Sequence, residues 1–229
     1  MIKPLIKQIS PLVSAYWRMR KILWIIKRQN RLRLYLENSQ VKKLQIGSSS
    51  NILEGWFNVD ILPFYKGALF LDATQPFPFK DETFNYIFSE HMIEHITYNE
   101  SLAMLSECYR VLKPGGKIRL ATPDLETLAG LYVKNKSDEQ KQYIKSVIDR
   151  WLPNIANYRE SFVINKIFEF NHKFIWDCST LKDTLESIGF VDVIRSEPGK
   201  SDDEVFQNID VHKNDYIKFE TLVIEAKHP

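Results

Sequence analysis

The 229-residue chain is 44% hydrophobic and 26% charged, with a formal net charge of +2. A chain of this length and apolar content can bury a full core as one domain, which excludes a disordered or low-complexity protein. Two cysteines, Cys108 and Cys178, are too few for a disulfide framework and indicate a reducing cytoplasm.

The charge is unevenly distributed along the chain. Residues 1–43 hold eleven Lys/Arg against one acid, Glu37, so that this segment is +10 and the remainder is −8. No apolar run approaches the roughly 18 residues of a membrane-spanning helix, and the run Ile22–Ile26 is too short for a secretory signal. We therefore expect a basic amphipathic helical arm over residues 1–40, ahead of one domain over residues 41–229.

Between Ser14 and Leu36, aromatic and aliphatic side chains alternate with Arg and Lys. This mixture is typical of a helix lying in the interface of an anionic membrane, and it also fits a helix packed on the domain. Both readings stay open: packing on the domain, or membrane contact through residues 1–36. Nucleic acid is the partner we favour least. The expected location is cytoplasmic, or peripheral at the inner face of the membrane.

Short apolar runs follow the arm. Four strands are expected, over residues 43–46, 56–60, 68–71 and 84–88. From Asn99 to Leu112, apolar residues recur at three- and four-residue spacing, which predicts an amphipathic helix. We expect residues 113–116, Lys-Pro-Gly-Gly, to stop that helix before a strand over residues 117–121.

The last third of the chain departs from simple alternation. Residues 124–178 are predicted to form a helical, aromatic-rich insertion, followed by a helix over Leu181–Ile188 that Gly189 closes. Residues 191–195 and 219–226 are predicted strands, an antiparallel pair at the sheet edge. The fold class is therefore α/β: a doubly wound, mostly parallel seven-stranded sheet, Rossmann-like, with an antiparallel edge strand and a helical insertion.

Gly47, Asp60 and Asp72 each follow the carboxyl end of an expected strand, where open α/β sheets bind ligands. A glycine lets the backbone approach a ligand, and an acid can accept hydrogen bonds from two ribose hydroxyls. The alternative is that the acids cap loops or helices. The fingerprint of dinucleotide-binding loops needs more glycines, and an acid about 20 residues after the first of them. This loop has one glycine, so we expect a nucleoside ligand that carries no phosphates.

Several runs together carry a resemblance to a known family. The chain resembles class I S-adenosylmethionine-dependent methyltransferases, and most closely small bacterial proteins predicted to be type 11 methyltransferases. The resemblance runs to residue 226 and leaves out the basic arm. It is carried by residues 44–60, 72–79 (Asp-Ala-Thr-Gln-Pro-Phe-Pro-Phe), 84–88, 90–95, 110–116 (Arg-Val-Leu-Lys-Pro-Gly-Gly), 172–181, 189–190 and 222–226.

The resemblance implies S-adenosylmethionine as the cofactor, with the loop at Gly47 around its methionine end, Asp60 on the ribose and Asp72 beside the adenine. Residues 89–91 would line the methyl-transfer face. Ser49 stands where a second glycine is usual, and a serine there disfavours positive φ. The cofactor-binding candidates are Gly47, Ser48, Ser49, Asn51, Asp60, Ile61, Asp72, Ala73 and Glu90.

The run from His91 to His95 also matches H-x-x-E-H, an inverted zinc-protease signature. On a helix both histidines would share a face, with His172 as a third ligand. We prefer a different interpretation, in which His91 or Glu94 takes a proton from the acceptor. A third reading is that these groups cap the following helix. The catalytic candidates are His91, Glu94 and His172, and we predict no metal.

The aromatic residues of segment 151–176 form either a lid that excludes water or the core of the insertion. The predicted function is methyl transfer from S-adenosylmethionine to an unidentified acceptor, a sugar, glycan or small-molecule hydroxyl. The alternatives are a methyltransferase-fold binding module without activity and, more remotely, a zinc-dependent hydrolase that uses His91, Glu94 and His95.

Overall fold

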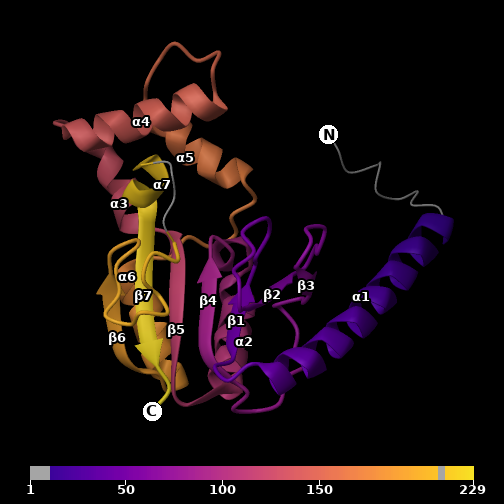
Figure 1. Ribbon diagram of the computed structural model, residues 1–229. Coiled ribbons are helices and arrows are strands. Elements are labelled where there is room, and N and C mark those ends of the chain that lie inside the picture. Colours follow the sequence, from indigo (N-terminus) through magenta and orange to yellow (C-terminus); the bar gives the residue numbers. More distant parts are fainter. Residues whose placement is uncertain (1–10, 211–214) are drawn as a thin grey trace.

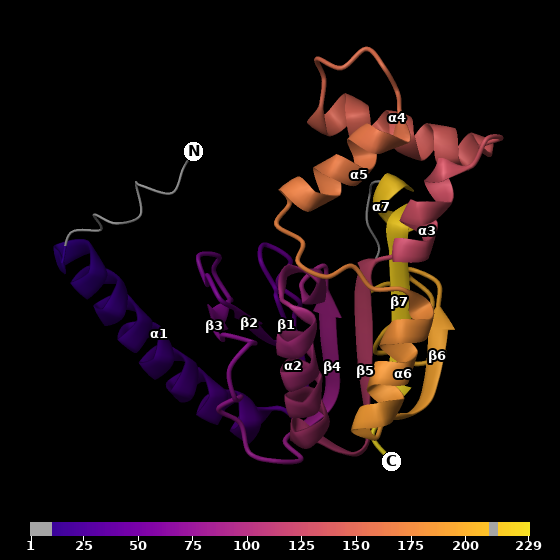
Figure 2. The ribbon, with the colours of Figure 1, turned by 180° about the vertical axis from the view of Figure 1, so that it is seen from behind.

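The structure is a computed structural model that describes residues 11–210 and 215–229. Its helices and strands are arranged as a sheet with a long helix at one side and a helical unit at one end (Figures 1 and 2). In chain order they are α1 (Pro11–Asn38), β1 (Lys43–Ile46), β2 (Phe57–Asp60), β3 (Leu69–Phe70), β4 (Phe84–Glu90), η2 (Ile93–His95), α2 (Tyr98–Val111), β5 (Leu112–Pro123), α3 (Leu125–Ala129), η3 (Gly130–Tyr132), α4 (Asp138–Trp151), α5 (Glu160–Glu169), α6 (Cys178–Ile188), β6 (Val191–Ser196), α7 (Asp215–Glu220) and β7 (Thr221–Lys227).

The seven strands form one sheet in the order β3-β2-β1-β4-β5-β7-β6. Neighbouring strands from β3 to β5 are parallel, whereas β7 is antiparallel to both β5 and β6. The order reverses between β1 and β4, so the carboxyl ends of these two strands flank the switch point where open α/β sheets bind ligands. The predicted fold class is confirmed, with β7 inserted one strand in from the edge.

Helices α2 and α6 lie together on one face of the sheet (Figure 2). Thr97 starts α2 with a capping box to Glu100, and Gly189 ends α6 in the left-handed conformation at φ 118°. Their buried apolar residues pack on the strands and form the main core, whose fully buried members include Leu44, Ile87, Met104, Leu105, Ile118, Leu181 and Leu185. The helix predicted over 99–112 is therefore the central packing element of this face.

Two of the runs that carried the family resemblance are joined by hydrogen bonds. Arg110, in α2, donates to the carbonyl oxygens of Phe77 and Phe79 at 3.0 and 2.9 Å. Glu107 accepts from the N–H of Phe77 at 2.5 Å and pairs with Arg110. Arg110 also forms an ion pair with Asp81 at 2.6 Å. These contacts hold the loop before β4 against α2.

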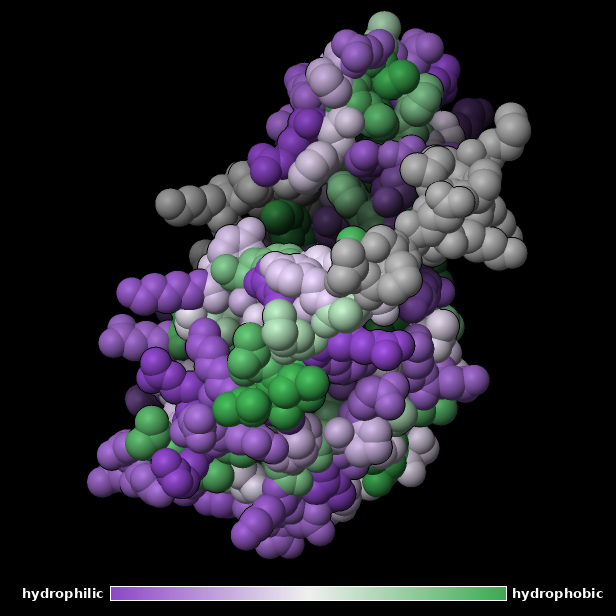
Figure 3. Space-filling model, turned by 90° about the vertical axis from the view of Figure 1, so that its right-hand side faces the viewer, coloured by the Kyte–Doolittle hydropathy of each residue, from purple (hydrophilic) through white to green (hydrophobic). Residues whose placement is uncertain are grey.

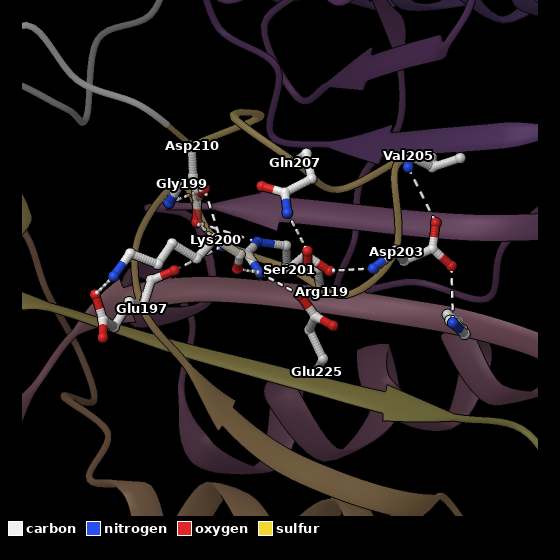
Figure 4. Close-up of polar contacts among 11 residues, drawn as sticks. Arg119, Glu197, Gly199, Lys200, Ser201, Asp203, Val205, Gln207, Asp210 and Glu225 are labelled. Atoms are coloured by element: carbon white, nitrogen blue, oxygen red, sulfur yellow. Dashed lines mark hydrogen bonds and ion pairs between the residues drawn. The ribbon is translucent and has the colours of Figure 1, made fainter.

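On the opposite face of the sheet, a loop with no helix takes the place of a helical layer. Arg119, on β5, is 0% exposed and binds Asp210 through two nitrogens, with the shortest distance 2.8 Å. It also donates to Glu225 of β7, which stands directly opposite it, and to the carbonyl oxygen of Lys200 at 3.0 Å. Figure 4 shows how these contacts draw the loop 197–210 onto the sheet.

The predicted insertion forms a helical unit of its own at the carboxyl ends of the strands (Figure 1). The unit begins after Asp124, and the chain rejoins the main domain at Trp176. These two residues form an isolated parallel bridge, so the two ends of the unit lie side by side. Helices α3, α4 and α5 share a separate apolar core, against which Phe219 of α7 also packs. Its buried members are Leu128, Leu131, Tyr143, Ile144, Val147, Ile148, Val163 and Ile167.

The described part of the basic arm forms helix α1, which ends close to the boundary expected at residues 40 and 41. It runs out from the β3 side of the sheet (Figure 1). Residues 1–10 of the predicted arm lie outside the described residues. Within the described part of the chain, no helix is both long and apolar enough to cross a bilayer.

One boundary prediction is wrong. Strand β5 begins at Leu112, immediately after α2, rather than at residue 117. The segment Lys113–Gly116 is a bulge within the strand, since Leu112 pairs with Phe84 and Lys117 with Tyr86. Gly115 takes φ 78° and its N–H donates to the carbonyl oxygen of His228, so the bulge is fastened to the end of the chain.

Candidate functional site

The loop after β1 and the end of β2 are joined by a set of short hydrogen bonds. The N–H groups of Gly47 and Ser48 donate to the carbonyl oxygen of Val59 at 2.9 and 3.0 Å. The N–H of Ser49 donates to Oδ2 of Asp60 at 2.9 Å, and that of Leu62 donates to Oδ1 at 2.8 Å. Each oxygen keeps a further lone pair, so Asp60 can still accept from ribose hydroxyls.

The loop has the tight conformation that glycines usually supply. Gly47 has φ 76°, and a Cβ on it would lie 2.6 Å from the side chain of Met92. Ser49 has φ 42°, although it carries a side chain. The serine therefore takes the left-handed conformation that the sequence led us to doubt, at a local cost that the loop's other contacts offset.

Polar groups from β4 meet the same loop. Asn51 donates to Glu90 at 3.3 Å, which links the cofactor loop to the residue before His91. Ser48 and Ser89 each bury a hydroxyl oxygen that has no hydrogen-bond partner among the described residues. Buried polar atoms without partners are uncommon and call for a ligand or water. The loop, the acid and these hydroxyls fit the polar methionine and ribose parts of an adenosine cofactor.

The remaining cofactor candidates lie at the side of this group. The carboxylate of Asp72 accepts from the N–H and hydroxyl of Thr74 at 3.1 and 2.7 Å, which is the loop-capping arrangement. Ala73 packs on the main core, and Ile61 is 54% exposed. Asp72 stays close to Asp60 through the backbone, because the N–H of Leu71, the residue before Asp72, donates to the carbonyl oxygen of Asp60 at 2.9 Å.

All three predicted catalytic residues line one cavity of about 250 Å³ beneath the helical unit. His91, Glu94 and His172 come to it from the β4–α2 connection and from the segment after α5. The rest of its wall is partly apolar and partly charged: His95, Pro123, Tyr143, Val147, Trp151, Lys166, Ile167, Phe170, Ile217 and Glu220. The site predicted from scattered positions is thus assembled in one place.

His91 is held on both sides of its ring. Its Nδ1 lies 3.3 Å from Oε1 of Glu94, and its Nε2 lies 3.4 Å from the hydroxyl of Thr221. Glu94 is fully buried, and its other carboxylate oxygen accepts from Thr122 at 3.1 Å. His91 itself has φ 45°, a strained conformation for a residue with a side chain.

The hydrogen bonds favour the doubly protonated form of His91. Thr221 donates its only hydroxyl proton to the carbonyl oxygen of Ile217 at 2.6 Å, so it can only accept from the histidine. Burial opposes a charge on His91, but the hydrogen bond and charge of Glu94 outweigh it and raise the histidine pKa. Burial likewise acts against the Glu94 carboxylate, and its contact with His91 lowers the carboxyl pKa below its ordinary value.

The metal-binding alternative takes a different form from the one expected. His91 precedes the short helix η2 and faces Glu94, so it does not share a helix face with His95. The donor atoms of Glu94, His95 and His172 instead lie within 4.8 Å of one another. Donors around one zinc ion, at bonds of about 2.1 Å, are roughly 3.4 Å apart, so this group is wider than a formed zinc site.

Burial lowers the pKa of His172, which favours its neutral form in the cavity. Its Nδ1 is buried and has no hydrogen-bond partner among the described residues. Its ring lies 4.8 Å from that of His95 and 6.0 Å from that of Phe170. The neutral ring of His172 therefore lies against the aromatic part of the cavity wall.

Sequence reasoning missed three polar residues of the cavity: Glu220, Tyr143 and Lys166. Burial raises the pKa of Glu220, although its carboxylate accepts a hydrogen bond from the hydroxyl of Tyr143. The insertion contributes Tyr143 and Lys166, while Glu220 comes from α7 near the end of the chain. The one available signal was an isolated acid just before the last apolar strand.

The two readings of segment 151–176 each hold for part of it. Trp151 and Phe170 line the cavity, with ring centroids 5.2 Å apart. Phe162 packs into the core of the insertion, and Trp176 is 0% exposed in the main core. Phe168 is 61% exposed and does neither.

Comparison with known proteins agrees with these observations. Residues 65–120 match the model of a family described as a methyltransferase domain. Over 68 residues the chain is 38% identical to phosphoethanolamine N-methyltransferase 2 of Caenorhabditis elegans, which covers 30% of the chain and 14% of that protein. The chain thus matches about one seventh of the length of this curated relative.

Two solved structures align with most of the chain at low identity. A S-adenosylmethionine-dependent methyltransferase from Archaeoglobus fulgidus is 19% identical, with 91% of this chain and 94% of that chain covered and a TM-score of 0.49. A phosphoethanolamine N-methyltransferase 2 from Haemonchus contortus, solved with S-adenosylhomocysteine, is 15% identical over 88% of this chain and 53% of that one, with a TM-score of 0.41. The resemblance predicted from the sequence is confirmed by the family match over residues 65–120 and by the strand order of the sheet. In strand order and in the sequence of residues 65–120, the chain is therefore similar to the class I S-adenosylmethionine-dependent methyltransferases.

Proposed function

We propose that the protein transfers a methyl group from S-adenosylmethionine to a hydroxyl of a sugar, glycan or other small acceptor held in the cavity beneath the helical unit. The observation that carries this proposal is the His91–Glu94 pair, which lines the cavity. The pair directly follows Glu90, which contacts Asn51 of the cofactor loop. A proton-accepting pair thus stands between the loop and the cavity.

The bound cofactor supplies an activated methyl group, so the chain's own residues have to align the acceptor and remove its proton. Glu94 holds Nδ1 of His91 and fixes the ring, as in other histidine–carboxylate pairs. For catalysis, Nε2 would exchange its contact with Thr221 for the hydroxyl of the acceptor. In this mechanism His91 must first lose the proton that its surroundings stabilise. Catalysis should therefore increase as the pH rises through the raised pKa of His91.

The walls of the cavity suit an acceptor with both apolar and hydroxyl surfaces. Trp151 and Phe170 present aromatic faces, on which the C–H faces of a sugar ring can stack. Lys166 and His172 add hydrogen-bonding groups from the same side. Because the helical unit covers the cavity, bound acceptor would be screened from water while the methyl group is transferred.

The test has two stages, binding and turnover. The full chain is first titrated with S-adenosylmethionine by calorimetry, where the absence of binding would contradict the proposal. Transfer of an isotope-labelled methyl group is then followed into defined saccharides. Label should appear with the wild type and with the exposed control variant Tyr132→Gln, and be lost in His91→Gln.

Two alternatives predict other outcomes. A binding module without activity would take up the cofactor with the affinity of an enzyme and label none of the acceptors. A zinc-dependent hydrolase would retain stoichiometric zinc after purification, and substitution of His95 or His172 would remove that zinc. A cytoplasmic location is part of our proposal, and it is supported by the two free cysteines, Cys108 and Cys178.

A further inference from the structure

Helix α1 has two apolar faces, and the domain covers one of them. Trp24 stacks on Phe70 at 5.9 Å, and Arg28, which is 7% exposed, donates to the carbonyl oxygen of Phe70 at 3.0 Å. Further along the helix, the hydroxyl of Tyr35 bonds both the N–H and the carbonyl oxygen of Lys43. This side of the helix fixes its direction relative to the β3 edge of the sheet.

The opposite side of α1 carries a second apolar stripe: Met19, Ile22, Leu23 and Ile26. Their spacing of three, four and seven residues places them on one helix face. They are 55%, 57%, 58% and 48% exposed. Large apolar side chains repeated in this way on an exposed helix mark an interaction surface rather than scattered surface residues. On the side of the molecule viewed in Figure 3, hydrophobic patches are bordered by hydrophilic side chains.

Charge identifies the partner of this stripe. Helix α1 contains seven Lys/Arg and one acid, Glu37. A second copy of the helix would bring two strongly positive surfaces together, whereas an anionic lipid surface attracts both the charges and the apolar stripe. The guanidinium of Arg20 lies within 5.6 Å of the ring centroids of Tyr16 and Trp17, which are 47% and 43% exposed, and aromatic residues beside cations are suited to the membrane interface.

We propose that the stripe Met19-Ile22-Leu23-Ile26 and the surrounding basic residues dock the protein on an anionic lipid surface, with α1 lying in the interface. Because the other face of α1 is packed on the domain, the bound helix would set the orientation of the whole domain. The loop that follows Asp60 would then lie across α1 from the lipid, since the rings of Phe64 and Trp24 have centroids 6.0 Å apart. This proposal is independent of methyl transfer.

The test is co-sedimentation of the full chain with vesicles of phosphatidylcholine, with and without phosphatidylglycerol. We expect binding only when phosphatidylglycerol is present, and weaker binding at high salt. Replacing the four stripe residues by Gln should reduce partitioning at least roughly tenfold, as should the triple substitution Arg18→Gln, Lys27→Gln and Arg33→Gln.

The control is Tyr132→Gln with Val133→Gln, which removes two exposed apolar side chains of the helical unit, 60% and 42% exposed, and should bind as the wild type does. A thermal melt of each variant separates lost binding from lost folding. The proposal is overturned if the stripe variant binds vesicles as the wild type does. It is also overturned if the wild type binds vesicles of phosphatidylcholine alone as well as it binds vesicles that contain phosphatidylglycerol. It is also overturned if light scattering shows a dimer that the stripe substitutions dissociate, because the occupant is then a second copy.

Discussion

The N–H of Ser49 donates to Oδ2 of Asp60 across 2.9 Å, which joins the loop after β1 to the end of β2. The second oxygen of the same carboxylate holds the N–H of Leu62 at 2.8 Å. Asp60 therefore shapes two loops of the predicted cofactor site while keeping lone pairs for a ligand. Its substitution should affect the site more than the loss of one contact would suggest.

Asp60→Ala should reduce affinity for S-adenosylmethionine at least roughly tenfold, since a hydrogen bond to a charged group contributes about 1.5–3 kcal/mol. Asp60→Asn keeps one acceptor oxygen and should lose less. Isothermal calorimetry measures both variants, with Asp183→Asn, an exposed acid of α6, as the control. Unchanged affinity in Asp60→Ala would place the ribose elsewhere.

Ser49→Gly should change cofactor affinity less than about threefold, because the loop already has the left-handed conformation and no population shift is required. The effect on stability should stay within about 1 kcal/mol, since relief of the left-handed serine is offset by the greater freedom of glycine in the unfolded chain. Calorimetry and a urea titration test the two statements. A large gain in affinity would show that the serine hinders binding.

The pKa of His91 should fall in Glu94→Gln. The carboxylate that stabilises the imidazolium is then gone, while burial, which opposes the charge, remains. A titration followed by NMR of the His91 ring measures this without knowledge of the acceptor. The matched variant Glu90→Gln removes a more weakly acting acid and should lower the pKa less. An unaltered His91 pKa in Glu94→Gln would contradict the assigned pair.

The His91–Glu94 pair should stabilise the fold most at mildly acidic pH. The raised pKa of His91 contributes stability that is fully present below its ordinary 6.5 and is lost as pH rises through the folded-state value. The lowered pKa of Glu94 contributes stability above its ordinary 4.5 that is lost as pH falls through the folded-state value. The difference in melting temperature between the wild type and Glu94→Gln should thus be largest between the two ordinary pKa values, 4.5 and 6.5, and should become smaller at alkaline pH.

Arg119→Met should destabilise the protein by about 3–5 kcal/mol, because it leaves Asp210 and Glu225 buried without their cation. Lys200→Met, which breaks an ion pair at a 69% exposed side chain, should destabilise the protein far less. Urea unfolding of the two variants, followed by circular dichroism, provides the comparison. Equal stabilities would mean that the buried cluster is not coupled to folding.

Periodicity and turn residues were enough to predict the strands, the helix α2 and the loop from Gly47 to Asp60, because each depends on neighbours in the sequence. The start of β5 was missed because the bulge at Gly115 is fixed by a bond to His228, far along the chain. The cavity was predicted only in part for the same reason. Tyr143 and Glu220 lie 77 residues apart, and no local sequence pattern predicts the hydrogen bond between them.

Loop 197–210 covers a face of the sheet by polar contacts, through the carboxylate of Asp210 and the carbonyl oxygens that Arg119 binds, and by the buried ring of Phe206, which packs against Trp56 and Phe88. A segment held in this way need not be regular to be rigid. Its protected amides, such as the N–H of Gly199 that donates to Asp210 at 2.8 Å, should exchange with solvent at rates set by the opening of the sheet itself. We therefore expect this stretch, which has no helix or strand, to unfold together with the sheet.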